Sequence, residues 1–335
     1  MKSLVSVPKG TTFDTFFTPE NINLLNSLGN TVWNTGNSRM TKDELCEMIR
    51  DCDVYFALWG SPKIDADVLE KANKLKLITV LGSTVTPFVS DAVWEKGIKV
   101  ISAFDWFSES TAEAAIAYIL CSLRKIPYFT DRLKKDRIWK KESDRTEGLI
   151  HRSVGIISYG GVGKHLVKKL SVFNVDIKVY DIRKIDAAEK ERYGFNQCGI
   201  EEIFSSCDVI SINTPYNQNT HHMINERLMS MIKPGALLLN TSRGGVVDQK
   251  ALTEHLKNGD FNAALDGYET EPIDMDDPLL DLDNVLMLPH QGGVTTDLRP
   301  LLTKELINES YGFIEKGQPL KNEISSSYAK TMSKN

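Results

Sequence analysis

The stretch of sequence that decides the fold is VGIISYGGVG, residues 154–163. Its apolar beginning predicts a buried strand, and the apolar spacing of residues 164–173 predicts a helix directly after the glycines. The stretch is close to the GxGxxG pattern of dinucleotide-binding folds, with Gly160 and Gly163 in place and Ser158 in the first glycine position. Gly160 would let the backbone approach a pyrophosphate, and Gly163 would let the helix pack closely on the strand. We therefore expect a dinucleotide to be bound by Tyr159, Gly160, Gly161, Val162 and Gly163.

The acidic residue that this pattern calls for is also present. The next predicted strand, residues 177–181, ends in Asp181, and dinucleotide folds place an acidic residue about 20 residues after the glycines. A carboxylate there accepts hydrogen bonds from both ribose hydroxyls of the adenosine half and repels a 2′-phosphate. This favours NAD over NADP as the cofactor, although the nearby Arg183 could stack on adenine or tolerate a phosphate.

Strands and helices alternate along the chain on both sides of this loop. Strands are expected at residues 4–7, 31–34, 53–58, 77–81, 98–101, 154–157, 177–181, 209–212, 236–240, 263–266 and 285–288. Helices are expected at residues 19–28, 43–51, 65–74, 91–96, 111–124, 164–173, 201–205, 224–231 and 249–258. Such alternation predicts parallel sheets with helices on both faces. We expect an α/β protein with two Rossmann-like, doubly wound domains, and a frayed end at residues 325–335.

Length and composition narrow the class of protein. The 335 residues favour two domains, and the net charge of −5 argues against the basic footprint of a nucleic-acid-binding protein. No run of about 18 apolar residues predicts a membrane span. The first residues lack the apolar core of a secretory signal, and the five cysteines are scattered without a CxxC pair. We expect reduced thiols and a cytoplasmic protein.

Two other clusters of polar residues are given ordinary explanations. The mixed-charge run at residues 131–145 is expected to be a solvated helical face, with an anion-binding patch as the alternative. His221 and His222 are adjacent in a predicted loop, where their geometry is unsuited to one metal ion. We expect no metal site.

Three polar residues follow predicted strands and could therefore meet in one pocket. Arg243, Glu271 and His290 each come shortly after a strand, and ligands bind at the carboxyl ends of strands in open α/β sheets. A histidine can give or take the proton that a carbonyl gains on reduction. A neighbouring carboxylate would fix its ring, and an arginine could hold a substrate carboxylate and polarise its carbonyl. Taken singly, each residue is equally typical of an ordinary structural role. Arg243 could form a surface ion pair, Glu271 could be a loop carboxylate, and His290 could cap a helix.

Five runs, in this order, closely resemble the D-isomer-specific 2-hydroxyacid dehydrogenases. They are VGIISYGGVG at 154–163, CDVISINTPYNQNTHHMIN at 207–225, IKPGALLLNTSRGGVVDQKAL at 232–252, AALDGYETEP at 263–272 and NVLMLPHQGG at 284–293. The resemblance is strong from about residue 75 to residue 293. SRGG with the following VVDQKAL, and LPHQGG after NV, are its most specific motifs. It implies hydride transfer between NAD(H) and a small D-2-hydroxy acid or 2-keto acid.

The resemblance also implies a role for each matching residue. Arg243 would bind the substrate carboxylate and carbonyl, and His290 would be the general acid and base, assisted by Glu271. The implied cofactor residues, besides those of the glycine loop and Asp181, are Thr214, Pro215, Thr220, Thr241, Ser242, Asp266, Gly292 and Gly293. The implied substrate residues, besides Arg243 and His290, are Ser83, Thr84 and Val85, whose backbone would bind the carboxylate.

The family resemblance implies a discontinuous domain arrangement. Residues 1–109 and 291–335 would form a flavodoxin-like substrate domain, and residues 110–290 would form an inserted NAD-binding domain. Hinges are expected near residues 108–111 and 292–295. Members of the family are commonly dimers through the cofactor domain, so a homodimer is expected.

Departures from the family pattern leave the substrate open. Ser158 replaces a glycine, Asn213 and Thr84 replace a frequent histidine and glycine, and residues 104–107 are unusually aromatic. The sequence does not identify the side chain of the 2-hydroxy acid. One alternative function is a non-enzymatic NAD-sensing protein of the corepressor type, which shares this fold. A formate-dehydrogenase-like enzyme is the other, but such relatives typically carry glutamine in place of Glu271.

Overall fold

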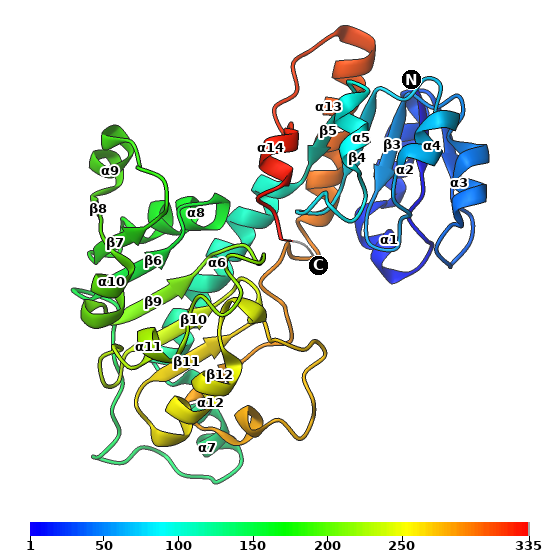
Figure 1. Cartoon of the computed structure of the whole chain (residues 1–335). Helices are drawn as coiled ribbons and strands as arrows, with labels where there is room; N and C mark the ends of the chain where they lie inside the picture. Colours follow the sequence, from blue (N-terminus) through cyan, green and yellow to red (C-terminus); the bar gives the residue numbers. More distant parts are fainter. Residues whose placement is uncertain (334–335) are drawn as a thin grey trace. The chain divides into compact units, whose positions relative to one another are not determined.

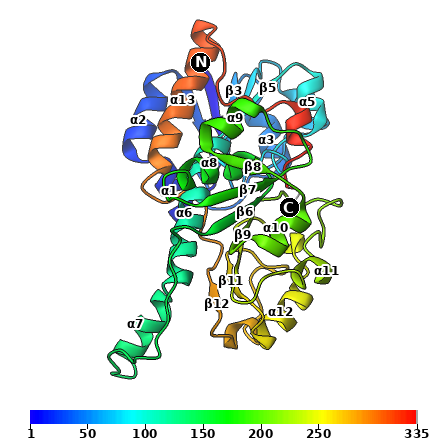
Figure 2. The ribbon, with the colours of Figure 1, turned by 90° about the vertical axis from the view of Figure 1, so that its left-hand side faces the viewer.

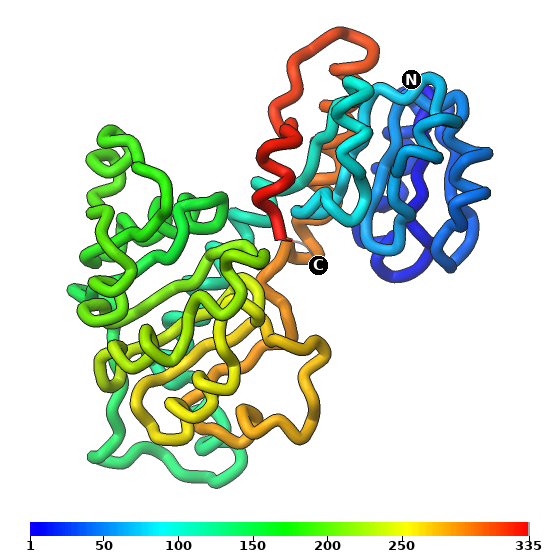
Figure 3. The backbone as a smooth tube through the Cα atoms, in the orientation of Figure 1, coloured from blue at the N-terminus to red at the C-terminus, as the bar shows by residue number. Residues whose placement is uncertain are grey.

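The computed structural model describes residues 1–333, which form two compact units. The first unit contains Met1–Phe107 and the chain from Val294 onward, and the second is Ser108–Gly293. The chain therefore enters the second unit once and returns to the first, as the trace in Figure 3 allows the reader to follow. Each unit is built on its own sheet, and the two are described separately below.

The first unit is a five-stranded parallel sheet in the order β2-β1-β3-β4-β5. Its strands are β1 (Lys2–Val5), β2 (Asn30–Trp33), β3 (Val54–Ala57), β4 (Leu77–Val80) and β5 (Lys99–Ser102). Its helices are α1 (Thr11–Phe16), α2 (Pro19–Ser27), α3 (Lys42–Met48), α4 (Ala66–Lys71), α5 (Asp91–Glu95), α13 (Arg299–Lys316) and α14 (Ser326–Ala329). This strand order is the flavodoxin-like one.

The second unit is a seven-stranded parallel sheet in the order β12-β11-β10-β9-β6-β7-β8 (Figure 1). Its strands are β6 (Ser153–Ile157), β7 (Asp176–Tyr180), β8 (Phe195–Gln197), β9 (Val209–Ile212), β10 (Leu237–Asn240), β11 (Asn262–Leu265) and β12 (Val285–Met287). Its helices are α7 (Ile126–Lys134), α8 (Gly161–Leu170), α9 (Ala187–Tyr193), α10 (Ile200–Ser206), α11 (Glu226–Met229), α12 (Gln249–Asn258) and the 3₁₀ turns η1 (Gly244–Val246) and η2 (Pro278–Asp281). The first six strands follow the dinucleotide-binding order, which confirms two doubly wound α/β domains.

Both faces of each sheet are buried, as parallel sheets require. On β3, Val54 and Phe56 pack into one apolar cluster while Tyr55 packs into the cluster on the opposite face. On β10, Leu238 faces one cluster and Leu239 the other. Successive side chains of a strand point to opposite faces, so these short apolar runs fill two cores at once.

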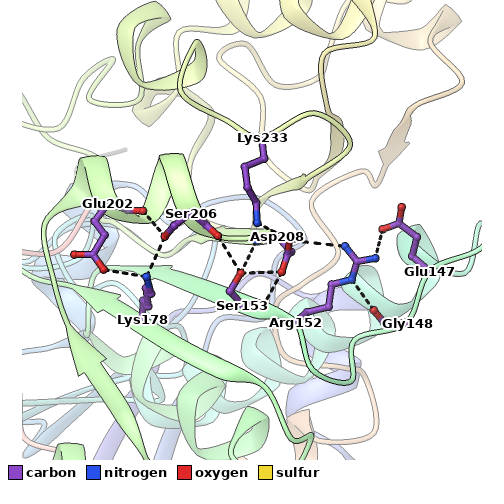
Figure 4. A network of polar contacts seen from close by, with 9 residues as sticks. All are labelled: Glu147, Gly148, Arg152, Ser153, Lys178, Glu202, Ser206, Asp208 and Lys233. Atoms are coloured by element: carbon purple, nitrogen blue, oxygen red, sulfur yellow. Dashed lines mark hydrogen bonds and ion pairs between the residues drawn. The ribbon is translucent and has the colours of Figure 1, made fainter.

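A polar network ties the amino ends of β6 and β9 to the helices beside them (Figure 4). Asp208 accepts hydrogen bonds from the backbone N–H (2.9 Å) and hydroxyl (2.8 Å) of Ser153 and pairs with Lys233 at 2.6 Å. Burial alone would raise the pKa of Asp208, but these partners outweigh it and the pKa is lowered. The ammonium of Lys178 on β7 donates to the hydroxyl of Ser206 at 3.1 Å. Charged groups therefore line the edge of the sheet at which β6 and β9 begin, opposite the edge that carries the glycine loop.

The helix α6 (Phe104–Leu123) begins seven residues before the helix that was expected at 111–124. The hydroxyl of Ser102 accepts the backbone N–H of Phe104 at 3.2 Å, so the helix starts there. Ser108 and Ser110 are buried within the helix, and the hydroxyl of Ser110 donates to the carbonyl of Gly293 at 3.1 Å. The boundary between the two compact units lies between Phe107 and Ser108, inside this helix, and the hinge expected near residues 108–111 stays a prediction.

The charged run at residues 131–145 is not one helical face, because α7 ends at Lys134. The guanidinium of Arg132 is only 4% exposed and makes two hydrogen bonds to Asp144, at 2.6 and 2.7 Å, and one to the carbonyl of Trp139. These bonds hold the pKa of Asp144 well below its usual range. A bidentate ion pair thus folds the segment back onto α7, and only part of the run is solvated helix.

The C-terminal segment is ordered where the sequence suggested fraying. Residues 326–329 form α14, with the hydroxyl of Ser325 accepting the backbone N–H of Tyr328 at 3.2 Å. The carbonyl of Ser333 accepts the hydroxyl of Thr86 at 3.2 Å. The expected fraying is wrong up to residue 333, and residues 334 and 335 lie outside the described part. Among residues 1–333, no helix combines the length and the apolar character needed to cross a bilayer.

The turn between β6 and α8 depends on the absence of a side chain at Gly163. A Cβ atom at this position would lie 2.2 Å from the backbone oxygen of Ser158. A backbone oxygen, unlike the end of a flexible side chain, cannot move aside by rotation about a side-chain bond. We predict that Gly163→Ala lowers the free energy of unfolding by about 1–3 kcal/mol, as overpacking does. Equilibrium urea denaturation followed by circular dichroism measures this loss.

Gly148→Ala is the matched control in the same unit. Its Cβ would have no neighbour within 4 Å, so it should leave the unfolding free energy unchanged or slightly higher. Equal losses for the two variants would show that the contact with Ser158 does not set the packing of α8.

Candidate active site

The glycine loop presents an open helix start at the carboxyl end of β6. Gly160 caps α8, and a Cβ there would meet no atom within 4 Å, so the space above the helix N-terminus is free on this side. Ser158 has φ 82°, in the left-handed region that favours glycine, so it adopts the conformation that the missing first glycine would take. The N–H groups at the start of α8 form the kind of cradle that binds phosphate.

Tyr159 contributes its backbone rather than its side chain to this loop. Its ring is 4% exposed, and its hydroxyl donates to Glu189 at 2.8 Å. Its backbone N–H donates to Asp181 at 2.8 Å. Of the predicted loop residues, Gly161 and Val162 form the first turn of α8 beside it.

Asp181 follows β7 and is held as a carboxylate beside the glycine loop. One oxygen accepts the N–H of Tyr159, and the other accepts the backbone N–H of Arg183 at 2.9 Å. Burial would raise the pKa of Asp181, but these bonds and the Arg183 guanidinium outweigh it, and the pKa is lowered. The oxygen bound to the N–H of Arg183 also accepts the Nε–H of that residue at 3.3 Å, so the second lone pair of the other oxygen is the one that can accept a ribose hydroxyl.

The loop after β9 lies beside the glycine loop, because β9 pairs with β6. Thr214 is buried, and its hydroxyl donates to the carbonyl of Ile157 at 3.5 Å. The hydroxyl of Thr220 donates to the carbonyl of Pro215 at 2.7 Å and closes the loop. The amide of Asn213 turns back to the carbonyl of Ser211 at 3.1 Å.

Thr241, directly after β10, provides a test of whether the unit fits a cofactor. Its hydroxyl oxygen is buried and has no hydrogen-bond partner among residues 1–333, and such an atom costs about 1–3 kcal/mol when it stays unpaired. A polar group of a bound molecule would satisfy it. The neighbouring Ser242 hydroxyl instead donates to the side-chain oxygen of Asn240 at 2.8 Å. The orphaned hydroxyl and the open start of α8 both fit a dinucleotide.

Asp266, which follows β11, fixes the chain after β12. Its two carboxylate oxygens accept the backbone N–H groups of Gln291 and Gly292, each at 2.6 Å. Burial raises the pKa of Asp266 more than these bonds lower it. Gly292 must lack a side chain, because a Cβ would lie 2.6 Å from Asp266 Oδ2. Gly293 is held in turn by the hydroxyl of Ser110.

The imidazole of His290 pairs with the carboxylate of Glu271. Nδ1 of His290 lies 2.6 Å from Oε2 of Glu271, a distance typical of a charge-assisted hydrogen bond. The other oxygen of Glu271 accepts the backbone N–H of Tyr268 at 3.0 Å, so the carboxylate is held at both ends. The side chains of His290 and Glu271 are 43% and 35% exposed, and Nε2 is the ring nitrogen that this contact does not use.

Arg243 begins η1 beside this pair. Burial lowers the pKa of Arg243, and the negative charge of Glu271 opposes that shift, so the two groups are within electrostatic reach. The segments that carry them touch, because a Cβ on Gly244 would lie 1.8 Å from the backbone carbon of Tyr268. The structure therefore gathers Arg243, Glu271 and His290 at the ends of three adjacent strands.

Residues 83–85, the expected substrate loop, follow β4 in the first unit. Ser83 and Thr84 are half-buried, whereas Val85 is fully buried and can offer only its backbone. The carbonyl of Ser83 accepts the hydroxyl of Ser102 at 3.3 Å. Arg243 and His290, the other expected substrate residues, belong to the second unit.

Sequence analysis missed Tyr268 and Gly244 as parts of this arrangement. The hydroxyl of Tyr268 donates to the carbonyls of Leu265 and Leu288, at 3.1 and 2.9 Å, and thereby joins the ends of β11 and β12. The glycines that follow Arg243 were the only signal that two loops approach closely there. Among residues 1–333, no three His, Cys, Asp or Glu side chains gather as a metal ion would require.

Comparison with known proteins identifies the family. Residues 116–292 match the family described as D-isomer specific 2-hydroxyacid dehydrogenase, NAD binding domain. The chain is 37% identical to a D-3-phosphoglycerate dehydrogenase of Methanocaldococcus jannaschii over 82% of its own length, but it spans only 52% of that relative. It is 31% identical to a hydroxypyruvate reductase of Thermotoga maritima over 81% of this chain and 88% of the relative.

A solved structure supports the same fold. The chain resembles a glyoxylate reductase from Paecilomyes thermophila with a TM-score of 0.80 at 23% identity, over 98% of this chain and 99% of that one. The match to the family's NAD-binding domain covers more than half of the chain, and the hydroxypyruvate reductase is matched along most of both lengths. The chain therefore belongs to the family of D-isomer specific 2-hydroxyacid dehydrogenases.

Proposed function

We propose that the protein is an NAD-dependent oxidoreductase that transfers a hydride between NAD(H) and a small D-2-hydroxy acid or 2-keto acid. The observation that carries this proposal is the contact between His290 and Glu271 beside Arg243, in the unit that matches the NAD-binding domain of the family. Relatives named hydroxypyruvate reductase and glyoxylate reductase support the class of substrate. The bound nicotinamide supplies or accepts the hydride.

The three polar side chains have complementary tasks in this reaction. Glu271 engages Nδ1 of His290, so Nε2 is the atom that can give a proton to the carbonyl oxygen or take one from the hydroxyl. The carboxylate stabilises the imidazolium form that precedes proton donation. Arg243 would bind the substrate carboxylate and polarise the carbonyl with charge-assisted hydrogen bonds.

The two units would divide the work between cofactor and substrate. We assign residues 110–290 to NAD binding, through the glycine loop, Asp181, the loop of Thr214, Pro215 and Thr220, and the hydroxyls of Thr241 and Ser242. We assign residues 1–109 and 291–335 to substrate binding, through the backbone at residues 83–85. The boundaries between the two compact units support this division. They lie between Phe107 and Ser108 and between Gly293 and Val294 in the chain.

Removal of the proton donor or of the guanidinium should abolish most turnover. His290→Asn keeps a residue that tolerates the left-handed backbone at φ 55° but cannot act as the acid. We expect it to lower kcat by at least about a hundredfold, and Arg243→Ala to do the same, while NADH still binds. NADH absorbance with glyoxylate, hydroxypyruvate, pyruvate and bulkier 2-keto acids measures turnover, and NADH fluorescence measures binding.

The matched control is His255→Ala, which removes a histidine that pairs with Asp260 at 2.8 Å in the same unit. Its turnover should equal that of the wild type. Nearly full activity in either active-site variant would refute the role assigned to that residue. A wild-type protein that binds NADH but reduces none of the 2-keto acids would instead favour the NAD-sensing alternative.

Asp181 should determine the choice between NADH and NADPH. Asp181→Asn keeps the volume of the side chain but removes the charge that repels a 2′-phosphate. We expect the ratio of kcat/KM for NADH to that for NADPH to fall about tenfold, which corresponds to about 1.4 kcal/mol. Glu189→Gln, which alters a nearby carboxylate bound to Tyr159, should leave the ratio unchanged. An unaltered ratio in Asp181→Asn would exclude the contact with the ribose.

We also propose that the protein is a homodimer, with the arm at residues 126–150 in the interface. Figure 2 shows α7 standing apart from the sheet of its own unit. Large apolar side chains remain exposed along the arm, namely Ile126, Tyr128, Leu133, Ile138, Trp139 and Ile150. Trp139 is 76% exposed, and such a concentration of apolar surface is typical of a protein interface. A second copy of the chain would cover it.

Loss of apolar surface from the arm should separate the copies. We expect the wild type to show twice the mass of one chain in size-exclusion chromatography with light scattering. Ile138→Ser combined with Trp139→Ser should shift it towards one chain, because each large apolar side chain contributes about 1.5–3 kcal/mol when buried. Ile182→Ser, at an 89% exposed position that follows β7, is the control and should stay dimeric. A dimer that survives the double substitution would place the interface elsewhere.

A further inference from the structure

A second histidine–carboxylate pair lies next to the candidate active site and has no part in the chemistry described above. Nε2 of His222 contacts Oε1 of Glu269, and the two side chains are 36% and 33% exposed. Glu269 is separated from Glu271 by one residue. His222 stands at the end of the loop that begins with Thr214. The pair therefore joins two loops that follow different strands.

The segment of His222 is also bound to the segment that follows Arg243. The backbone N–H of His222 donates to the carbonyl of Gly245 at 2.9 Å, and that of Ile224 donates to the carbonyl of Val246 at 3.0 Å. Gly245 lies under the ring of Tyr216, where a Cβ would come within 2.6 Å. The loop after β9 is thus fixed to η1 by its backbone and to the loop after β11 by the side chain of His222.

Glu269 is anchored at both its side chain and its backbone. Its carboxylate contacts His222, and its backbone N–H donates to the side-chain oxygen of Gln249 at 3.0 Å. The preceding residue, Tyr268, donates its own N–H to the carboxylate of Glu271 at 3.0 Å. Because Tyr268 and Glu269 are adjacent in the chain, a shift of Glu269 would move the N–H group that orients Glu271.

The backbone at His222 indicates that this contact is favoured despite a local cost. His222 has φ 48°, in the left-handed region that costs a residue with a side chain roughly 1–2 kcal/mol. Its ring stacks on that of His221, with centroids 3.9 Å apart. The hydroxyl of Tyr216 in turn lies 3.5 Å from Nδ1 of His221. The surrounding contacts therefore hold the His222 ring against Glu269.

We propose that His222 and Glu269 are positioning residues, which hold the segments of Arg243 and Glu271 in the register that the reaction needs. This proposal rests on the oxidoreductase function proposed above. Neither side chain touches the reacting atoms. Their effect passes through Glu269 and Tyr268 to Glu271 and so to the His290 ring. Since small displacements of catalytic groups are costly, such a brace contributes to turnover more than to cofactor binding.

The test compares four variants with a control. His222→Asn keeps a residue that tolerates the left-handed backbone but is too short to reach Glu269. Glu269→Ala removes the other partner, and the double variant removes both. Glu269→Gln keeps an oxygen that can accept a hydrogen bond from His222. His255→Ala breaks another histidine–carboxylate pair of the same unit, in which His222 and Glu269 have no part, and controls for a general loss of stability.

We expect His222→Asn and Glu269→Ala each to lower kcat about tenfold with unchanged KM for the 2-keto acid and unchanged NADH affinity. The double variant should be no slower than either single one, because the two residues act as a unit. Glu269→Gln should recover part of the lost kcat. Amide hydrogen exchange in the peptide at residues 266–272 should be faster in His222→Asn and Glu269→Ala and unchanged in His255→Ala.

Two results would overturn the proposal. The first is a kcat for His222→Asn no lower than that for His255→Ala. The second is a double variant whose loss is the product of the single losses, because the residues would then act independently. A wild type without activity on any 2-keto acid would refute the proposed function. In that case, hydrogen exchange still decides whether the pair braces residues 266–272, and unchanged exchange in both single variants would refute the brace itself.

Discussion

The parallel register of β10, β11 and β12 is the constraint on which the candidate site depends. Asn240 lies opposite Leu265, and Leu265 lies opposite Met287, so the three strands end at the same edge of the sheet. Neighbouring strands are about 4.8 Å apart, and residues that follow their ends are brought close whatever their separation in the chain. The guanidinium of Arg243, the carboxylate of Glu271 and the imidazole of His290 can therefore meet there because of the sheet alone. The buried leucines and alanines that fix the sheet also fix the site.

Small residues then set how closely the loops beyond these strands approach. Gly244 lies against the backbone of Tyr268, and Gly292 lies against the carboxylate of Asp266, where a Cβ would come within 1.8 and 2.6 Å of them. A methyl group at either place would push apart the segments that carry the polar residues. Gly163 has the same effect on the turn of Ser158 in the glycine loop. The sheet brings these loops near one another, and each glycine allows them to come into contact.

Apolar runs and strand ends are local patterns, and from them the sequence predicted the polar residues beyond the strands and the strands themselves, except β8. The doubly wound arrangement was implied by the family resemblance. The sequence predicted that Arg243, Glu271 and His290 could meet, but it did not predict the other contacts between distant residues. The helix expected from residue 111 begins at Phe104, where the hydroxyl of Ser102 at the end of β5 accepts the backbone N–H of Phe104. Arg132 pairs with Asp144 across a turn, and the hydrophobic periodicity of the sequence does not indicate this contact. His222 meets Glu269 only because β9, β10 and β11 are neighbours in the sheet.

Hydrogen bonds hold the ring of His290, its backbone and the residues that follow it, and together they orient the imidazole. Its ring is held by Glu271 at 2.6 Å, and its own backbone N–H donates to the carbonyl of Leu288 at 3.0 Å. The next two N–H groups donate to Asp266. Glu271 therefore fixes the ring, and Asp266 fixes the chain directly after this residue, whose φ is 55°. The energy that holds this backbone comes from folding, so the imidazole is already oriented before any ligand binds, and ligand binding need not supply that energy.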